Sequence, residues 1–157
     1  MSTNVRTNAP GQTLNSTGRA VCNSAPGEEV MGSAKTVLLV DDDADQLLLF
    51  SALLEREHCR VLMAHSAKEA LDVLSRHPVD LVVADVAMPE MTGLDLAEKI
   101  RSDKLKGRVP IVLMTAGTEA LDFSASAFRV DMFCLKQNLK RTFIPGLKDL
   151  LHGQTLN

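Results

Sequence analysis

Unbroken apolar runs that end in a polar or charged residue are the feature of this sequence that most constrains its fold. A continuous run without alternation is typical of a strand covered on both faces, as in a parallel sheet. The clearest example is 81–84, followed by a single carboxylate, Asp85, and by a turn that contains Pro89 and Gly93. Open α/β sheets bind their ligands just beyond the carboxyl ends of such strands. Asp85 is therefore expected at the edge of the sheet where a ligand would bind.

Apolar runs of this kind alternate with segments in which apolar residues recur at helical spacing. The expected strands cover 36–40, 60–64, 81–84, 111–114 and 132–135. Helices are expected over about 47–57, from Ser66 to about 76, from Thr92 or Gly93 to about 100, over 118–128, and from Thr142 to about 151. Alternating strands and helices with right-handed crossovers form a parallel sheet. The sequence therefore predicts an α/β fold, a doubly wound five-stranded parallel sheet with helices on both faces.

Local signals predict several helix ends. Asp43 is placed to cap the first helix rather than to bind a metal. Ser66 with Glu69 three residues later is a capping-box signature for the second helix. In the last helix, Thr142 as N-cap would put Pro145 in the first turn, where its missing N–H matters least.

The two ends of the chain differ in composition from the part between them. Residues 1–34 are rich in Ser, Thr, Asn, Gly and Pro, and such a segment buries too little surface to offset the entropy of ordering it. We expect a disordered N-terminal tail over 1–34, a folded domain over 35–151 and a short C-terminal tail over 152–157. This length leaves no room for a second, output domain, so we expect the domain to stand alone.

Composition argues against several classes of function. The 157 residues carry a formal net charge of -3 and include no Tyr or Trp, which disfavours binding of nucleic acid through a basic surface or by base stacking. No apolar run approaches the roughly 18 residues that span a bilayer, and the N-terminus lacks a secretion signal. Cys22, Cys59 and Cys134 are odd in number and lack zinc-like spacing, which favours a reducing, cytoplasmic location.

Polar side chains end four of the five expected strands: Asp41 and Asp42 the first, Asp85 the third, Thr115 the fourth and Lys136 the fifth. A parallel sheet brings all of them to one edge. Crowded carboxylates raise one another's pKa unless a cation offsets their charge, and acidic oxygens with a carbonyl and waters suit Mg2+. A lysine supplies a point charge for a phosphoryl oxygen, and a hydroxyl can donate a hydrogen bond to it. The set predicts phosphoryl transfer onto Asp85, driven by charge neutralisation and positioning.

Motifs that carry these residues follow one another along the chain: Leu39–Asp43, Asp85–Pro89 with Gly93, Thr115–Ala116 and Phe133–Lys136. In them the chain, from Lys35 to about Leu151, resembles the receiver domain of two-component response regulators. The motifs resemble that family's acidic pair, phosphoacceptor loop, hydroxyl position and aromatic-to-lysine strand. The resemblance implies a flavodoxin-like strand order, 2-1-3-4-5.

The same resemblance implies partners, a cofactor and a role for each site residue. The phosphoryl donor would be a sensor histidine kinase or a histidine phosphotransfer protein, and Mg2+ would be required. The implied site residues are Asp85 as phosphoacceptor, Lys136 and Thr115 as its catalytic partners, Asp42, Asp85 and the Ala87 carbonyl as Mg2+ ligands, Asp41 as a ligand through water, and Thr115 and Phe133 as switch residues. The domain would itself catalyse the transfer and a slow hydrolysis, and phosphorylation would change its affinity for a downstream protein.

The sequence departs from the family pattern at three places. Gln137 follows the lysine where the family commonly has proline, so we expect a trans peptide there. Arg129–Val130 replaces the usual Gly-Ala pair with a bulkier turn that reaches positive φ less freely. Pro145–Gly146 interrupts the last helix. All three lie on the implied signalling face, so we expect phosphorylation chemistry to be retained and output coupling to be specialised or weakened.

Three other functions compete with the switch. A receiver-fold module that binds proteins independently of phosphorylation is motivated by the same departures. A flavodoxin-like cofactor binder is disfavoured because the acids at 41–43 would repel a phosphate. A haloacid-dehalogenase-type phosphatase also uses an Asp after the first strand, but its downstream context and cap domain are not matched.

Overall fold

The computed structural model describes residues 13–14, 20–21, 33–117 and 129–153. The chain divides into two compact units, 1–33 and 34–157. In the first unit, β1 (Thr13–Leu14) pairs with β2 (Ala20–Val21) in antiparallel orientation. This short pair lies within the stretch expected to be a disordered tail, and the expected domain limits stay a prediction.

The second unit is built on one five-stranded sheet. Its strands are β3 (Thr36–Val40), β4 (Arg60–Ala64), β5 (Leu81–Asp85), β6 (Ile111–Thr115) and β7 (Met132–Leu135). They lie in the order β4-β3-β5-β6-β7, and every neighbouring pair is parallel. The order confirms the predicted 2-1-3-4-5 topology, and the strand positions confirm that the apolar runs are strands.

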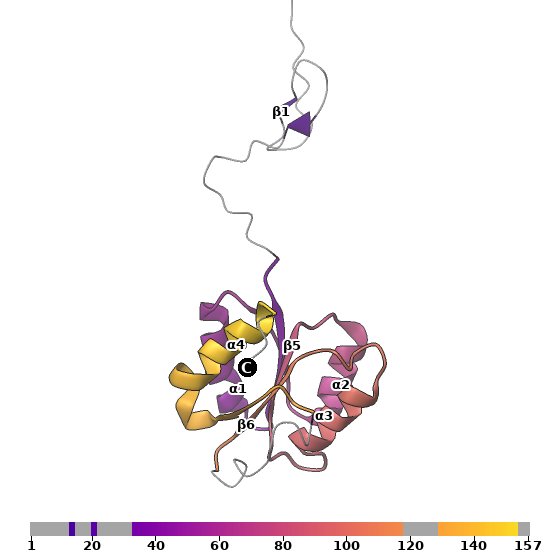
Figure 1. Cartoon of the computed structure of the whole chain (residues 1–157), viewed down its shortest axis with the longest axis vertical. Coiled ribbons are helices and arrows are strands. Elements are labelled where there is room, and N and C mark those ends of the chain that lie inside the picture. Colours follow the sequence, from indigo (N-terminus) through magenta and orange to yellow (C-terminus); the bar gives the residue numbers. More distant parts are fainter. Residues whose placement is uncertain (1–12, 15–19, 22–32, 118–128, 154–157) are drawn as a thin grey trace, which may run out of the picture. The chain divides into compact units, whose positions relative to one another are not determined.

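Helices cover both faces of this sheet. They are α1 (Ala44–Arg56), α2 (Ala67–Arg76), α3 (Gly93–Ser102) and α4 (Ile144–Leu151), with a 3-10 turn η2 (Lys136–Asn138) and a π-helix η3 (Leu139–Phe143) before α4. Figure 1 shows α1 and α4 on one face and α2 and α3 on the other. The helix expected over 118–128 lies outside the described residues. Among the helices that are described, none combines the length and apolarity needed to cross a bilayer.

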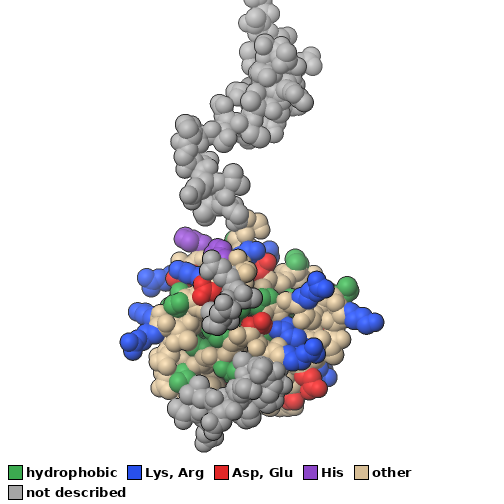
Figure 2. Space-filling model, viewed as in Figure 1, with side chains coloured by type: hydrophobic (Ala, Val, Ile, Leu, Met, Phe, Trp, Pro, Cys, Tyr) green, Lys and Arg blue, Asp and Glu red, His purple; other side chains and the backbone are tan. Residues whose placement is uncertain are grey.

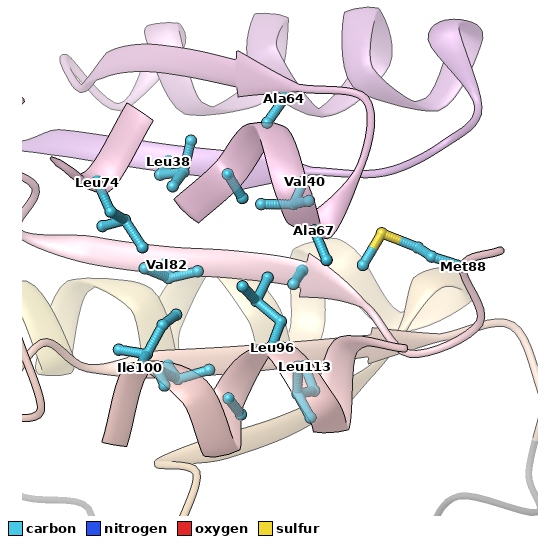
Figure 3. Close-up of a cluster of buried hydrophobic side chains, with 14 of the residues drawn as sticks. Leu38, Val40, Ala64, Ala67, Leu74, Val82, Met88, Leu96, Ile100 and Leu113 are labelled. Atoms are coloured by element: carbon cyan, nitrogen blue, oxygen red, sulfur yellow. The ribbon is translucent and has the colours of Figure 1, made fainter. Parts of the chain in front are cut away.

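The core has two halves, one on each side of the sheet. Side chains along β3 alternate between them: Leu38 and Val40 pack in the half that holds α2 and α3, and Val37 and Leu39 in the half that holds α1 and α4. Figure 3 shows the first half, where Leu96 of α3 points toward the strands. Both faces of the strand are covered, so both sets of side chains must be apolar. This is the physical reason why the strand sequences show no alternation.

Helix caps agree with the sequence in part. Asp43 caps α1, since its side chain accepts the N–H groups of Asp45 and Gln46. Ser66 caps α2, but the carboxylate of Glu69 accepts the N–H of His65 at 2.7 Å instead of that of Ser66. The predicted capping box of α2 is therefore only half formed. A complete one opens α3, where Thr92 and Asp95 bond each other's backbone N–H groups.

The start of the last helix was predicted wrongly. Thr142 is not its N-cap, because helical backbone begins directly after β7 and Thr142 lies inside η3. Pro145, in the first turn of α4, has no N–H, and in a regular α-helix its ring would crowd the carbonyl four residues earlier. The wider π-turn lies just before it, and the N–H of Ile144 bonds the carbonyl of Leu139 five residues back.

Arg101 on α3 forms hydrogen bonds that link α3 to the segments before β6 and before β7. Its guanidinium donates to the carbonyl oxygens of Arg129 (2.6 Å), Gly107 (3.0 Å) and Val109 (2.6 Å), and to the carboxylate of Asp131 (2.7 Å). Arg129, where the sequence indicates less access to positive φ than glycine would have, nevertheless adopts a φ of 54°. Its carbonyl is held in that turn by Arg101.

Replacing Arg101 by lysine is expected to lower the free energy of unfolding by about 2 kcal/mol, because one ammonium cannot reproduce the fork that serves four acceptors. Urea denaturation would measure the loss. Arg76→Lys is the matched control, because its pair with Asp72 is exposed and exposed pairs contribute at most about 1 kcal/mol. Equal losses in the two variants would show that the Arg101 contacts do not fasten the fold.

Candidate functional site

Three carboxylates meet at the carboxyl edge of the sheet. Asp41 and Asp42 follow β3, and Asp85 ends β5, the neighbouring strand. Each presents an oxygen, and these oxygens all lie within 4.8 Å of one another. Asp41 is 1% and Asp85 6% exposed, whereas Asp42 is open to solvent. The sheet register thus brings together acids that are more than forty positions apart in the sequence.

Lys136 reaches the same edge from the end of β7. Its Nζ lies 2.6 Å from Oδ2 of Asp41 and 3.3 Å from Oδ1 of Asp85. The described residues include no cis peptide bond, so the Lys136–Gln137 peptide is trans, as expected. The lysine reaches both acids without the cis geometry for which the family's proline is suited.

Burial and charge act against each other at this cluster. Burial raises the pKa of Asp85, Lys136 lowers it, and the neighbouring Asp41 raises it again; the balance is a pKa above the usual range for aspartate. For Lys136, burial alone would lower the pKa, but its hydrogen bonds and charge pairing with Asp41 and Asp85 outweigh this, and the pKa is raised. The lysine therefore stays protonated, whereas ionisation of Asp85 is less favourable in the folded protein than in the unfolded chain.

The loop after β5 is anchored at two points. Met88 is 7% exposed and packs in the core half that holds α2 and α3; its side chain points back toward Ala67 in Figure 3. At Gly93 the N–H donates to the carbonyl of Val86 at 3.0 Å. Ala87, whose carbonyl was predicted to bind a metal, lies between Val86 and Met88 and is exposed.

The two predicted switch residues lie outside the carboxylate cluster. Thr115 ends β6, and its hydroxyl exchanges hydrogen bonds with the backbone of Gly117, accepting its N–H at 3.2 Å and donating to its carbonyl at 3.4 Å. Phe133 on β7 is half-buried and packs against the core half that holds α2 and α3. The described hydrogen bonds of the Thr115 hydroxyl thus join it to its own loop and not to Asp85.

The donor set fits a hard divalent cation. Three carboxylates and one ammonium leave the cluster with excess negative charge, and two of the carboxylates are buried. Mg2+ prefers carboxylate and carbonyl oxygens, takes few protein ligands and keeps several waters. Asp42 is exposed to solvent. Its carboxylate can bind a cation without breaking an ion pair with Lys136, which pairs with Asp41 and Asp85.

In metal-free protein, Asp85→Asn is expected to raise the melting temperature at neutral pH. A carboxyl whose folded pKa is raised opposes folding when it is ionised, so stability falls as pH rises from about 3.9 through the folded pKa. Calorimetry in EDTA would measure the shift. Asp95→Asn is the control of opposite sign, because the hydrogen bonds from Thr92 lower the pKa of Asp95. A metal-free Asp85→Asn protein that melts below wild type would contradict this account of the cluster.

The chain matches the family described as response regulator receiver domain over residues 37–140. It is 30% identical over 122 residues to a probable cyclic di-GMP phosphodiesterase of Vibrio cholerae, an alignment that covers 78% of this chain and 27% of that protein. It is 35% identical over 98 residues to the two-component response regulator ORR5 of Oryza sativa, which covers 62% of this chain and 72% of the relative. The chain spans 27% to 52% of the lengths of the first four curated relatives that it matches.

Solved structures with the same fold include a receiver domain from Methanospirillum hungatei, with a TM-score of 0.68 and 28% identity over 78% of this chain and 97% of that one. The response regulator TrrA of Thermotoga maritima, solved in complex with Mg2+-BeF, has a TM-score of 0.67 and 29% identity over 74% of this chain and 98% of that one.

Proposed function

This chain belongs to the response regulator receiver domain family, and on that premise we propose that it is a phosphorylation-controlled switch whose phosphoacceptor is Asp85. The observation that carries the proposal is the placement of Lys136 against both Asp41 and Asp85, beside a third acid. A buried carboxylate with a lysine at 3.3 Å has the neighbour that charge-neutralised phosphoryl transfer needs.

In the proposed reaction an oxygen of Asp85 attacks the phosphorus of a phosphohistidine on a sensor kinase or phosphotransfer protein. The new O–P bond forms as the P–N bond breaks, and the electron pair of that bond stays on the imidazole nitrogen, which takes up a proton. Lys136 pairs with charge on the transferred group, and the restrained loop at Met88 and Gly93 holds the attacking carboxylate in place. Asp42, Asp85 and the Ala87 carbonyl would hold Mg2+, with Asp41 acting through water. Bound Mg2+ supplies further neutralisation of the phosphoryl oxygens.

Switching in this scheme involves the fourth and fifth strands. The hydroxyl of Thr115 would exchange its bonds with Gly117 for one to the phosphoryl group, and Phe133, now half-buried, would turn inward. The downstream target is a protein whose affinity changes with this rearrangement. The phosphoryl donors are of the class found in the cytoplasm, where we place the chain.

Incubation with acetyl phosphate and Mg2+ tests the proposal. We expect wild-type protein to gain a single adduct of about 80 Da in intact-mass spectra, and Asp85→Ala to gain none. Glu90→Gln is the matched control, because Glu90 is an exposed acid in the same loop and its loss should leave the adduct unchanged. An adduct that persists in Asp85→Ala, or that does not form on wild type, would exclude Asp85 as phosphoacceptor.

A further inference from the structure

A second candidate binding site lies at the opposite edge of the sheet from Asp85. A groove of about 370 Å³ runs between the end of α2 and the loop that joins α3 to β6. Val79 and Val109, which line it, each come two residues before a strand, β5 and β6 respectively. The groove therefore opens at the amino ends of the two strands whose carboxyl ends carry Asp85 and Thr115.

The groove has an apolar wall and one exposed leucine at its rim. Leu74, 5% exposed, lines it together with the two valines. Leu105 also lines it and is 91% exposed, more than any other large hydrophobic side chain among the described residues. Single exposed leucines are common on protein surfaces, but this one stands beside a concave apolar surface, where a second apolar side chain could cover it.

The loop presents Leu105 in a defined turn. The carboxylate of Asp103 accepts the N–H groups of Leu105 at 2.8 Å and Lys106 at 3.2 Å, and the carbonyl of Asp103 accepts the N–H of Gly107 at 2.8 Å. These bonds fix the backbone on both sides of the leucine. A preformed site loses less conformational entropy when a ligand binds.

The charge of the groove is of one sign. Its described lining includes two cationic side chains, Arg76 and Lys106, and no acidic residue, although the whole chain has a net charge of -3. Of the acids nearby, Asp72 pairs with Arg76 at 3.0 Å and Asp80 pairs with Lys35 at 3.6 Å. Asp103 accepts N–H groups in its own turn, so Lys106 is the lining cation whose charge none of these pairs offsets. Figure 2 shows Lys and Arg side chains on both sides of the domain, including the side that carries α2 and α3. Charge complementarity thus favours an acidic ligand.

We propose that this groove binds an acidic peptide segment of a partner protein that inserts one apolar side chain against Leu74 and Leu105. A concave apolar wall suits a side chain better than it suits a flat lipid surface. Nucleic acid is disfavoured because the described lining contains no Phe, Tyr or Trp ring on which a base could stack. Since the groove and the acidic cluster lie at opposite ends of the same strands, binding here does not require phosphorylation of Asp85.

Selection of random short peptides displayed on phage against the full-length chain tests the proposal. A parallel selection uses the double variant Leu105→Ser/Lys106→Glu, both of whose changes lie in a surface loop. We expect wild type to enrich peptides with net negative charge and a large aliphatic or aromatic residue. Synthetic versions of these peptides should bind the double variant about tenfold or more weakly, as loss of a binding hot spot does.

Leu49→Ser and Lys68→Glu provide matched controls, because they remove an exposed leucine and an exposed lysine that do not line the groove. We expect both controls, and also Asp85→Asn, to bind the selected peptides as wild type does. Enrichment of neutral or basic peptides, equal binding to the double variant, or no enrichment at all would overturn the proposal. So would loop-dependent binding of anionic vesicles or single-stranded DNA without binding of the peptides.

Discussion

Replacing Lys136 by alanine should lower the free energy of unfolding of metal-free protein by about 3 kcal/mol, because it leaves buried carboxylates without their cation. Among the described residues the lysine is the cation paired with Asp41, which is 1% exposed, and it also lies 3.3 Å from Asp85. Lys136→Ala should also slow phosphorylation by acetyl phosphate about 100-fold, as loss of one preorganised charge donor typically does. Urea denaturation in EDTA and time-resolved intact-mass spectra would measure the two effects.

Two comparisons separate this effect from a general loss of structure. Lys140→Ala removes an exposed lysine from the following π-helix and should change neither stability nor rate. In the Asp85→Asn background the loss caused by Lys136→Ala should be smaller than in wild type, because Asp85→Asn removes one of the charges that Lys136→Ala leaves unpaired. A Lys136→Ala protein as stable as Lys140→Ala would mean that the ion pairs contribute little. An equal loss from Lys136→Ala in both backgrounds would mean that Lys136 and Asp85 do not interact.

Among glycine-to-alanine changes at the described glycines, Gly93→Ala should lower stability the most. A Cβ on Gly93 would overlap the backbone oxygen of Asp85 and lie 3.0 Å from its carbonyl carbon and 3.2 Å from Cδ2 of Leu113. Backbone atoms cannot rotate away, so the start of α3 must move from the end of β5. We expect a loss of about 3 kcal/mol in the free energy of unfolding, at the upper end of overpacking effects, together with slower phosphorylation because Asp85 is displaced.

Gly153→Ala is the matched glycine control for this prediction. Gly153 has a φ of 71°, and a Cβ there would meet nothing within 4 Å. It should cost about 1 kcal/mol, from backbone strain alone. Equal losses of stability in the two alanine variants would show that the backbone at Gly93 and Asp85 can move apart with little loss of free energy.

The strands were predictable because burial on both faces leaves one simple sequence pattern. The runs at 36–40 and 111–114 are apolar at nearly every position, and the observed β3 and β6 begin at their first residues. Since parallel strands share a carboxyl edge, the meeting of Asp41 and Asp85 followed directly from those assignments. The resemblance to receiver domains added the strand order, which the local pattern does not contain.

Other features depended on geometry that local sequence does not encode. The start of the last helix was wrong because the backbone takes a wide turn ahead of Pro145, where an ordinary cap at Thr142 seemed sufficient. The sequence also did not show that Lys136 lies closer to Asp41 than to Asp85, since that depends on where the backbone of η2 places the side chain. The groove was missed because it joins Leu74 to Leu105, residues that only the folded chain brings together.

β5 is five residues long, roughly 16 Å at the usual rise per residue, and this distance weakens direct electrostatic coupling between its two ends. At that separation two unit charges interact by about 1 kcal/mol at an effective dielectric constant of about 20, so negative charge gained at one end acts only weakly on the other. A larger influence of the acidic end on a ligand at the far end requires that atoms along the intervening strand be displaced. A domain of this kind could bind two partners at once, and binding of one would change the affinity for the other very little unless the strand itself shifts.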